Sequence, residues 1–142
     1  VPVIFHSGFG ASGAGMPGGA GLTMEQACPI PWADEVAANF PSLTIVLAHP
    51  SWPWVEHQIA VALHKPNVFI DLSGWLPRYI PEDLMREVNT RLSDKAMFGS
   101  DYPYITPERW LEDLSRSVDI RDGVMELLMK GNAMRVLGMS EI

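Results

Sequence analysis

The sequence lacks the features that define disulfide-stabilised, membrane-spanning or secreted proteins. It has one cysteine, Cys28, in 142 residues, so an internal disulfide is excluded and a reducing, cytoplasmic location is expected. No apolar run approaches the roughly 20 residues that cross a bilayer. The first residues, VPVIFHSG, also lack the basic segment and the cleavage site of a signal peptide. We therefore expect no association with membranes.

Positive charge is also scarce. Ten Lys and Arg residues stand against 17 Asp and Glu residues, which gives a formal net charge of −7. Nucleic acids and anionic membranes attract basic surfaces, so the sequence predicts neither as a partner. The charges are dispersed along the chain, a pattern typical of solubility rather than of a binding patch.

The chain is long enough for one ordinary domain with its own core. Hydrophobic residues make up 47% of it, and this length lies in the range of single domains. We expect residues 1–142 to form one domain. The sequence has no initiator methionine and begins a strand almost at once, which predicts that it is a fragment of a longer protein.

Three apolar, strand-like runs each end on a side chain that can bind metal. PVIFH ends at His6, TIVLAHP carries His49, and AMFGSDYP carries Asp101. In parallel α/β barrels, functional residues lie at the carboxyl ends of the strands. This coincidence is the main functional signal, and it predicts that the three side chains meet on one rim.

The order of the elements predicts parallel β/α units, because helical crossovers connect parallel strands. An eight-unit barrel of about 250 residues averages about 31 residues per unit, so four units in 142 residues match half of a TIM barrel. Strands are predicted at 2–6, 43–48, 68–72 and 96–100. Helices are predicted at 32–40, 54–65, 81–92, from 106 through 114, at 121–130 and at 132–137.

Within the first helix, Trp32, Val36 and Phe40 fall on one stripe that we expect to face the core. Before that helix lies a glycine-rich segment, SGFGASGAGMPGGAGLT. Its G-x-G spacings would indicate a dinucleotide site only if the glycines opened a helix directly after the strand. Pro17 and the glycines after it interrupt such a helix, so a flexible rim loop or lid is the favoured interpretation.

A divalent cation needs neutral imidazoles or carboxylates that converge on one point. His6 and Asp101 sit at equivalent places on different strands, so a barrel would aim both at its axis. His49 is either a third ligand or a general acid/base beside the metal. Asp71, after VFI, either accepts a hydrogen bond from a rim group or has a structural role. Cys28 has no activating base nearby in sequence, which favours a structural thiol.

Aromatic residues gather in the segments that follow the predicted strands. Trp52, Trp75 and Tyr102 could sandwich a flat substrate on the rim, or they could pack loop against loop. Arg78 is the cation of the loop that follows Trp75, and it could pair with a substrate carboxylate or be solvated.

These motifs resemble the amidohydrolase superfamily, in its amidohydrolase-related, decarboxylase-like branch. The similar features are HSG at His6, LAHPSWPW at His49, VFIDLSGW, FGSDYP at Asp101 and the closing GNAMRVLG. The resemblance covers essentially the whole chain. It implies the C-terminal half, strands five to eight, of a (β/α)8 TIM barrel.

Members of that branch are metal-dependent decarboxylases, hydratases and hydrolases of small, often aromatic, carboxylic acids. The resemblance implies that His6 and Asp101 ligate zinc, or alternatively manganese. It implies that His49, together with Asp101, delivers or removes a proton beside the metal. The substrate-binding residues would be Trp52, Trp75, Arg78 and Tyr102.

The first-strand ligand pair of that family, H-x-H or E-x-H, has no counterpart here, and neither do its first four strands. An open half-barrel exposes strand edges and an apolar inner face. We therefore expect either a homo-oligomer or pairing with the missing barrel half. The alternative function is that of a catalytically incomplete half-barrel module that serves self-association.

Overall fold

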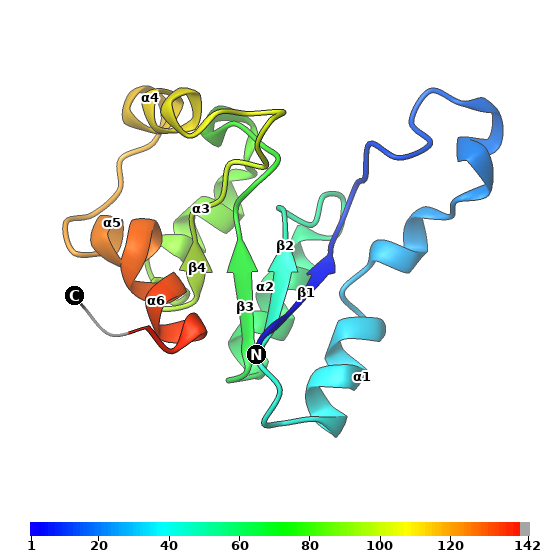
Figure 1. Cartoon of the computed structure of the whole chain (residues 1–142), viewed down its shortest axis with the longest axis horizontal. Coiled ribbons are helices and arrows are strands. Elements are labelled where there is room, and N and C mark those ends of the chain that lie inside the picture. The colour runs from blue at the N-terminus through cyan, green and yellow to red at the C-terminus, as the bar shows by residue number, and fades with distance from the viewer. Residues whose placement is uncertain (140–142) are drawn as a thin grey trace.

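The structure is a computed structural model that describes residues 1–139. Its centre is a sheet of four parallel strands in the order β1-β2-β3-β4 (Figure 1). The strands are Val3–His6 (β1), Ile45–Ala48 (β2), Val68–Asp71 (β3) and Ala96–Met97 (β4). Sequential order with parallel pairing requires a crossover between every pair of strands, and each crossover contains a helix.

The crossovers and the C-terminal segment carry the helices. The α-helices are Trp32–Asn39 (α1), Val55–His64 (α2), Glu82–Val88 (α3), Pro107–Ser117 (α4), Val124–Glu126 (α5) and Asn132–Leu137 (α6). Shorter turns are the 3₁₀ segments Pro17–Gly21 (η1), Met24–Ala27 (η2) and Pro77–Tyr79 (η3), and the π-helix Leu127–Gly131 (η4). None of the helices within residues 1–139 has the length and apolarity to cross a membrane. The predicted parallel α/β architecture is confirmed.

The register of the strands separates the two faces of the sheet. Phe5, Leu47, Ile70 and Ala96 lie in one row across all four strands, on the face that α2 and α3 cover (Figure 1). One residue further along, His6, Ala48, Asp71 and Met97 form a row on the opposite face. Neighbouring residues of a strand point to opposite faces. The sheet is therefore apolar where the helices pack and carries ionisable groups on its other face.

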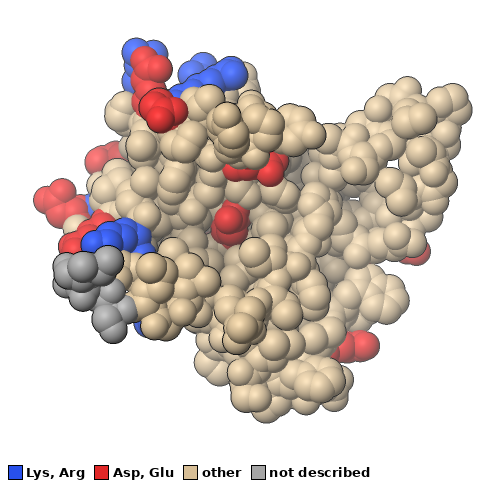
Figure 2. All heavy atoms as spheres, in the orientation of Figure 1, with Lys and Arg blue, Asp and Glu red and all other residues tan. Residues whose placement is uncertain are grey.

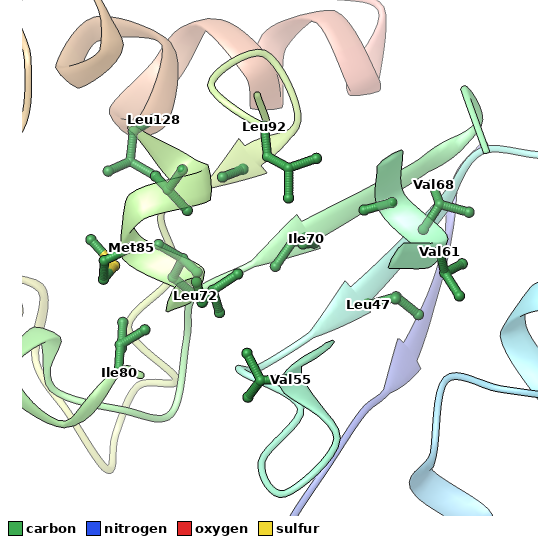
Figure 3. Close-up of a cluster of buried hydrophobic side chains, with 14 of the residues drawn as sticks. Leu47, Val55, Val61, Val68, Ile70, Leu72, Ile80, Met85, Leu92 and Leu128 are labelled. Atoms are coloured by element: carbon green, nitrogen blue, oxygen red, sulfur yellow. The ribbon is translucent and has the colours of Figure 1, made fainter. Parts of the chain in front are cut away.

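The core lies between the sheet and these helices (Figure 3). Side chains from the strands interdigitate with side chains from the helices and from the segment after β3. The largest of the fully buried aliphatic ones are Ile45, Leu47, Ile70, Leu72, Leu84, Leu92, Leu114 and Leu128. Burying a side chain of this size stabilises the fold by about 1.5–3 kcal/mol. This core fixes the sheet on which the rim residues stand.

The predicted inner stripe of the first helix is right at Val36, which packs against the core, and wrong at Trp32 and Phe40. Trp32 and Phe40 are 55% and 59% exposed, whereas Ala33 and Ala37 are buried. Moving by one residue turns a helix by about 100°, so α1 presents its small side chains to the core. The small side chains let α1 lie close to the core, and the large side chains of Trp32 and Phe40 remain in solvent.

The last strand is shorter than the predicted range 96–100. The backbone N–H of Phe98 donates to the carbonyl of Leu128 (2.8 Å) in η4 rather than continuing the ladder with β3. The predicted helices at 121–130 and 132–137 form one continuous helical run of α5, η4 and α6. The chain does not break between them because Gly131 has helical dihedrals (φ −60°, ψ −44°). They end at Gly138 (φ 66°), where the sequence predicted a stop.

The closing motif GNAMRVLG has a structural function. Asn132 is fully buried, and its amide Nδ2 donates to the carbonyls of Ser93 (2.9 Å) and Ala96 (2.8 Å). Arg135 donates to the carbonyl of Asp94. These bonds satisfy the backbone that leads into β4, so the C-terminal helix positions the strand that precedes Asp101.

We expect the substitution Asn132→Leu to lower the free energy of unfolding by at least about 2 kcal/mol, because it leaves two buried carbonyls without a donor. Urea denaturation measures the change. Asn39→Ala is the control, since the exposed Asn39 amide donates only to Glu35 in the same helix and its loss should cost little. Equal effects of the two substitutions would contradict this function of Asn132.

Candidate functional site

Two histidines meet at the carboxyl end of the sheet. His6 ends β1 and is level with Ala48, and His49 follows Ala48 directly. Their ring centroids lie 5.1 Å apart with the planes inclined at 63°, an edge-to-face arrangement. The sequence prediction that His6 and His49 share one rim is therefore confirmed by the geometry.

The ring of His49 is fixed by the segment that follows β3. Its Nδ1 lies 2.9 Å from the carbonyl oxygen of Ser73 and 2.9 Å from the Ser73 hydroxyl. A carbonyl oxygen only accepts hydrogen bonds, so the Nδ1 that faces it carries the proton. The other nitrogen, Nε2, is then the basic atom of the neutral ring.

Asp71 supports the same segment. Its carboxylate accepts a hydrogen bond from the backbone N–H of Ser73 (2.6 Å), and Ser73 in turn holds His49. A Cβ added at Gly99 would lie 2.6 Å from Oδ2 of Asp71, so glycine is required there for the carboxylate to fit. Of the two alternatives for Asp71, the structure favours a carboxylate that orients a rim group.

His6 lies beside His49 in a setting that disfavours its charged form. Partial burial lowers the pKa of His6, because it removes water from the charged form, and the nearby His49 lowers this pKa further. A hydrogen bond to the backbone of Gly8 and the negative charge of Asp101 act in the opposite direction without reversing the shift. The neutral imidazole is the form that binds metal ions.

Asp101 belongs to the same rim but not to the same close contact. It follows β4, is exposed, and has a positive φ of 65°; His49 also has a positive φ, of 73°. Non-glycine residues in this conformation cost free energy and occur at functional sites. Within residues 1–139, no three His, Cys, Asp or Glu side chains are close enough together to hold a metal ion. The structure therefore brings the two histidines into contact, but it does not gather His6, His49 and Asp101 within reach of one metal ion.

Aromatic side chains from three loops after the strands pair with one another. Trp52 and Trp75 lie 6.4 Å apart between ring centroids, and Phe9 lies 6.1 Å from Trp52. Sequence reasoning missed Phe9 because it stands in the glycine-rich segment. Tyr102, next to Asp101, is 73% exposed and joins none of the aromatic pairs in residues 1–139.

Arg78 has a protein partner. Its side chain forms an ion pair with the buried Asp113 of α4, and its backbone N–H also donates to that carboxylate (2.9 Å). Burial raises the pKa of Asp113, but the hydrogen bonds and charge of Arg78 outweigh burial and hold that pKa below its ordinary value. The pair ties η3 to α4, and the Arg78 side chain remains half exposed.

The structure also reveals contacts that no local sequence pattern indicated. The Sγ of Cys28 lies 3.3 Å from Nδ1 of His57, so the thiol has a neighbouring base from a segment 29 residues away. The buried Gln58 binds the turn after β2 through both atoms of its amide. Pairings between distant segments follow from tertiary structure alone.

The fold and the rim together define a class: a half of a TIM barrel with ionisable side chains at the carboxyl ends of its strands. A family model for amidohydrolases (Amidohydro_2) matches residues 1–139, and the chain belongs to the amidohydrolase family. Family members generally use divalent metals. Among curated proteins, the comparison found no match.

Three solved structures are similar. An uncharacterised TIM-barrel protein from Bordetella bronchiseptica is 30% identical (TM-score 0.74; 97% of this chain, 46% of that chain). Amidohydrolase 2 from Bifidobacterium longum subsp. infantis is 16% identical (TM-score 0.61; 99% and 50%). A dihydroxybenzoic acid decarboxylase from Polaromonas sp. JS666, with bound manganese and the inhibitor 2-nitroresorcinol, is 15% identical (TM-score 0.54; 75% and 37%). The chain thus spans half of these structures or less, and the prediction of a half-barrel is confirmed.

We expect Gly74→Ala to disturb His49. Gly74 has φ 77°, and a Cβ there would lie 2.7 Å from Nδ1 of His49. The matched control is Gly18→Ala, because Gly18 also has a positive φ (58°) but has no atom within 4 Å of such a Cβ. Both substitutions carry backbone strain, and Gly74→Ala adds a steric cost of roughly 1–3 kcal/mol. Urea denaturation and the imidazole NMR signals of His49 measure the difference, and matching results for the two would refute it.

Proposed function

We propose that this chain supplies the C-terminal half of a metal-dependent hydrolase or decarboxylase that acts on a small aromatic carboxylic acid. The observation that supports this most is the placement of His6, His49 and Asp101 at the carboxyl ends of three parallel strands. Membership of the amidohydrolase family supports the same reaction class.

The donor types present suit a divalent cation. Two imidazoles and a carboxylate are the groups that zinc and manganese bind in proteins. We assign His6 and Asp101 as ligands and zinc as the metal, with manganese as the alternative. When bound, the metal would polarise the substrate or activate a water molecule.

His49 is the proposed acid/base. The carbonyl of Ser73 holds the proton on Nδ1, which leaves Nε2 to take a proton from the reacting group or to return one. The positive charge that then forms on the ring is stabilised by the carbonyl that accepts from Nδ1. Asp101 is the second proposed proton carrier on the same rim, and its charge favours the protonated form of the neighbouring His6.

The aromatic residues at the rim support a planar substrate. Trp52 and Trp75 present neighbouring rings from the two loops that follow β2 and β3, and Tyr102 extends from the loop that carries Asp101. A flat substrate ring that binds between these aromatic side chains would be held by stacking and by exclusion of water. Arg78 is proposed to bind the substrate carboxylate with the part of its guanidinium that Asp113 leaves in solvent.

Asp101→Asn should abolish metal-dependent turnover, because the amide lacks the negative charge that a divalent cation and a proton transfer require. The measurement compares release of carbon dioxide or hydrolysis across a panel of aromatic acids with zinc or manganese added, using the chain together with any partner that completes the barrel. Asp122→Asn, an exposed carboxylate on the segment before α5, is the control. Unchanged turnover after Asp101→Asn would reject the assignment.

A second candidate function is self-association or pairing with a complementary barrel half. Ile4 of the edge strand β1 is 70% exposed on the face that the helices leave open. On the face seen in Figure 2, Lys and Arg lie toward the top and the left, and the middle carries acidic side chains among mostly uncharged residues. An exposed aliphatic side chain and an unpaired strand edge favour contact with another sheet.

Light scattering after size exclusion distinguishes these functions, combined with metal analysis. A mass twice that of the monomer with no bound zinc or manganese would support the self-association module. Stoichiometric metal would support the enzyme half. Ile4→Lys is the informative variant, because a charge on the open face should prevent pairing. A pairing that withstands this change would exclude this face as the contact.

A further inference from the structure

We infer that Gln58 is a positioning residue for His49, one that sets the imidazole in place by clamping the turn on which it stands. The proposal rests on the function assigned to His49 above. Gln58 lies on α2, nine residues after His49, and its side chain is fully buried. Neither its sequence neighbourhood nor the charged residues of the rim indicate this role.

The side-chain amide of Gln58 supplies one donor and one acceptor to the backbone of the turn after β2. Its Nε2 donates to the carbonyl of His49 (2.8 Å), and its Oε1 accepts from the backbone N–H of Ser51 (3.0 Å). One donor and one acceptor, two residues apart in the turn, are thereby satisfied by a single side chain. Buried backbone groups require such partners, and only an amide of this length supplies both from α2.

The turn needs this support because His49 has a conformation that non-glycine residues rarely adopt. Its φ is 73°, and such a residue persists only where its surroundings hold it. Gln58 holds the backbone of His49, and Ser73 holds the ring. The two contacts act on opposite ends of the same residue and together define where Nε2 points.

The clamp extends to the other histidine. The hydroxyl of Ser51 is hydrogen-bonded to the hydroxyl of Ser7, and both serines are almost completely buried. Ser7 follows His6 directly, and its backbone N–H donates to the carbonyl of Ala48 (3.1 Å). Gln58 therefore fixes the turn after β2, and the contacts of that turn with Ser7 tie His6 to His49. The loss of the Gln58 amide should change the separation of the two rings.

The test uses Gln58→Met, which keeps the length of the side chain and removes both hydrogen bonds. The readout is the rate at which the Nδ1–H proton of His49 exchanges with solvent, measured by NMR on the metal-free chain. The internal reference is the indole N–H of the buried Trp110, which donates to the carbonyl of Trp75 (3.0 Å). We expect the ratio of His49 exchange to Trp110 exchange to rise at least tenfold.

Asn132→Leu is the matched control. It removes an equally buried amide that makes two hydrogen bonds to the backbone, here to two carbonyls, so it reproduces the general loss of stability and should leave the ratio unchanged. If Gln58→Met does not fold, Gln58→Glu serves instead. Its carboxylate retains an acceptor for Ser51 but lacks the donor for His49, so the ratio should still rise.

An unchanged ratio in the folded Gln58 variant would overturn the proposal and leave Gln58 as a packing residue. Titration of the wild-type chain with zinc chloride, in the presence of any partner that completes the barrel, tests the proposed function separately. Absence of zinc binding together with a raised ratio would retain the clamp and reject the metal site. Zinc binding with an unchanged ratio would do the reverse.

Discussion

The parallel pairing of the four strands is the constraint on which the site depends. Because all strands run in one direction, their carboxyl ends lie at a single edge, and the side chains that follow them gather there. His6 and His49 reach a centroid distance of 5.1 Å from positions 43 residues apart in this way. Reversing one strand would carry its terminal residue to the opposite edge and separate the pair.

Two buried amides convert this arrangement into a defined geometry. Gln58 binds the turn that bears His49, and Asn132 binds the backbone that leads into β4 and on toward Asp101. Both side chains are fully buried, and both satisfy backbone groups that the sheet does not pair. The rim residues are therefore positioned by neutral side chains from helices, and the ionisable groups remain available for chemistry.

The open face of the sheet relates the fold to the family. Both faces of a parallel sheet are apolar because both are ordinarily covered, yet here helices pack on one face, and Ile4 on the other is largely exposed. The related structures are at least about twice as long as the part that this chain matches. The uncovered face accords with a chain that matches half or less of these structures, because a complete barrel closes the sheet on itself.

Local patterns were enough to predict the parallel order, the approximate place of each strand and the shared rim of His6 and His49, because apolar runs that end in polar residues can be recognised within one segment. The half-barrel followed from the chain length and from the family motifs. The local pattern misplaced the inner side of α1, since one residue of helical rotation separates Trp32 from Ala33. No sequence pattern predicts the hydrogen bond from His49 to the carbonyl of Ser73, the clamp by Gln58 or the ion pair of Arg78. Each of these contacts joins segments that packing brings together, and the residue pattern within one segment does not show which other segment it will contact.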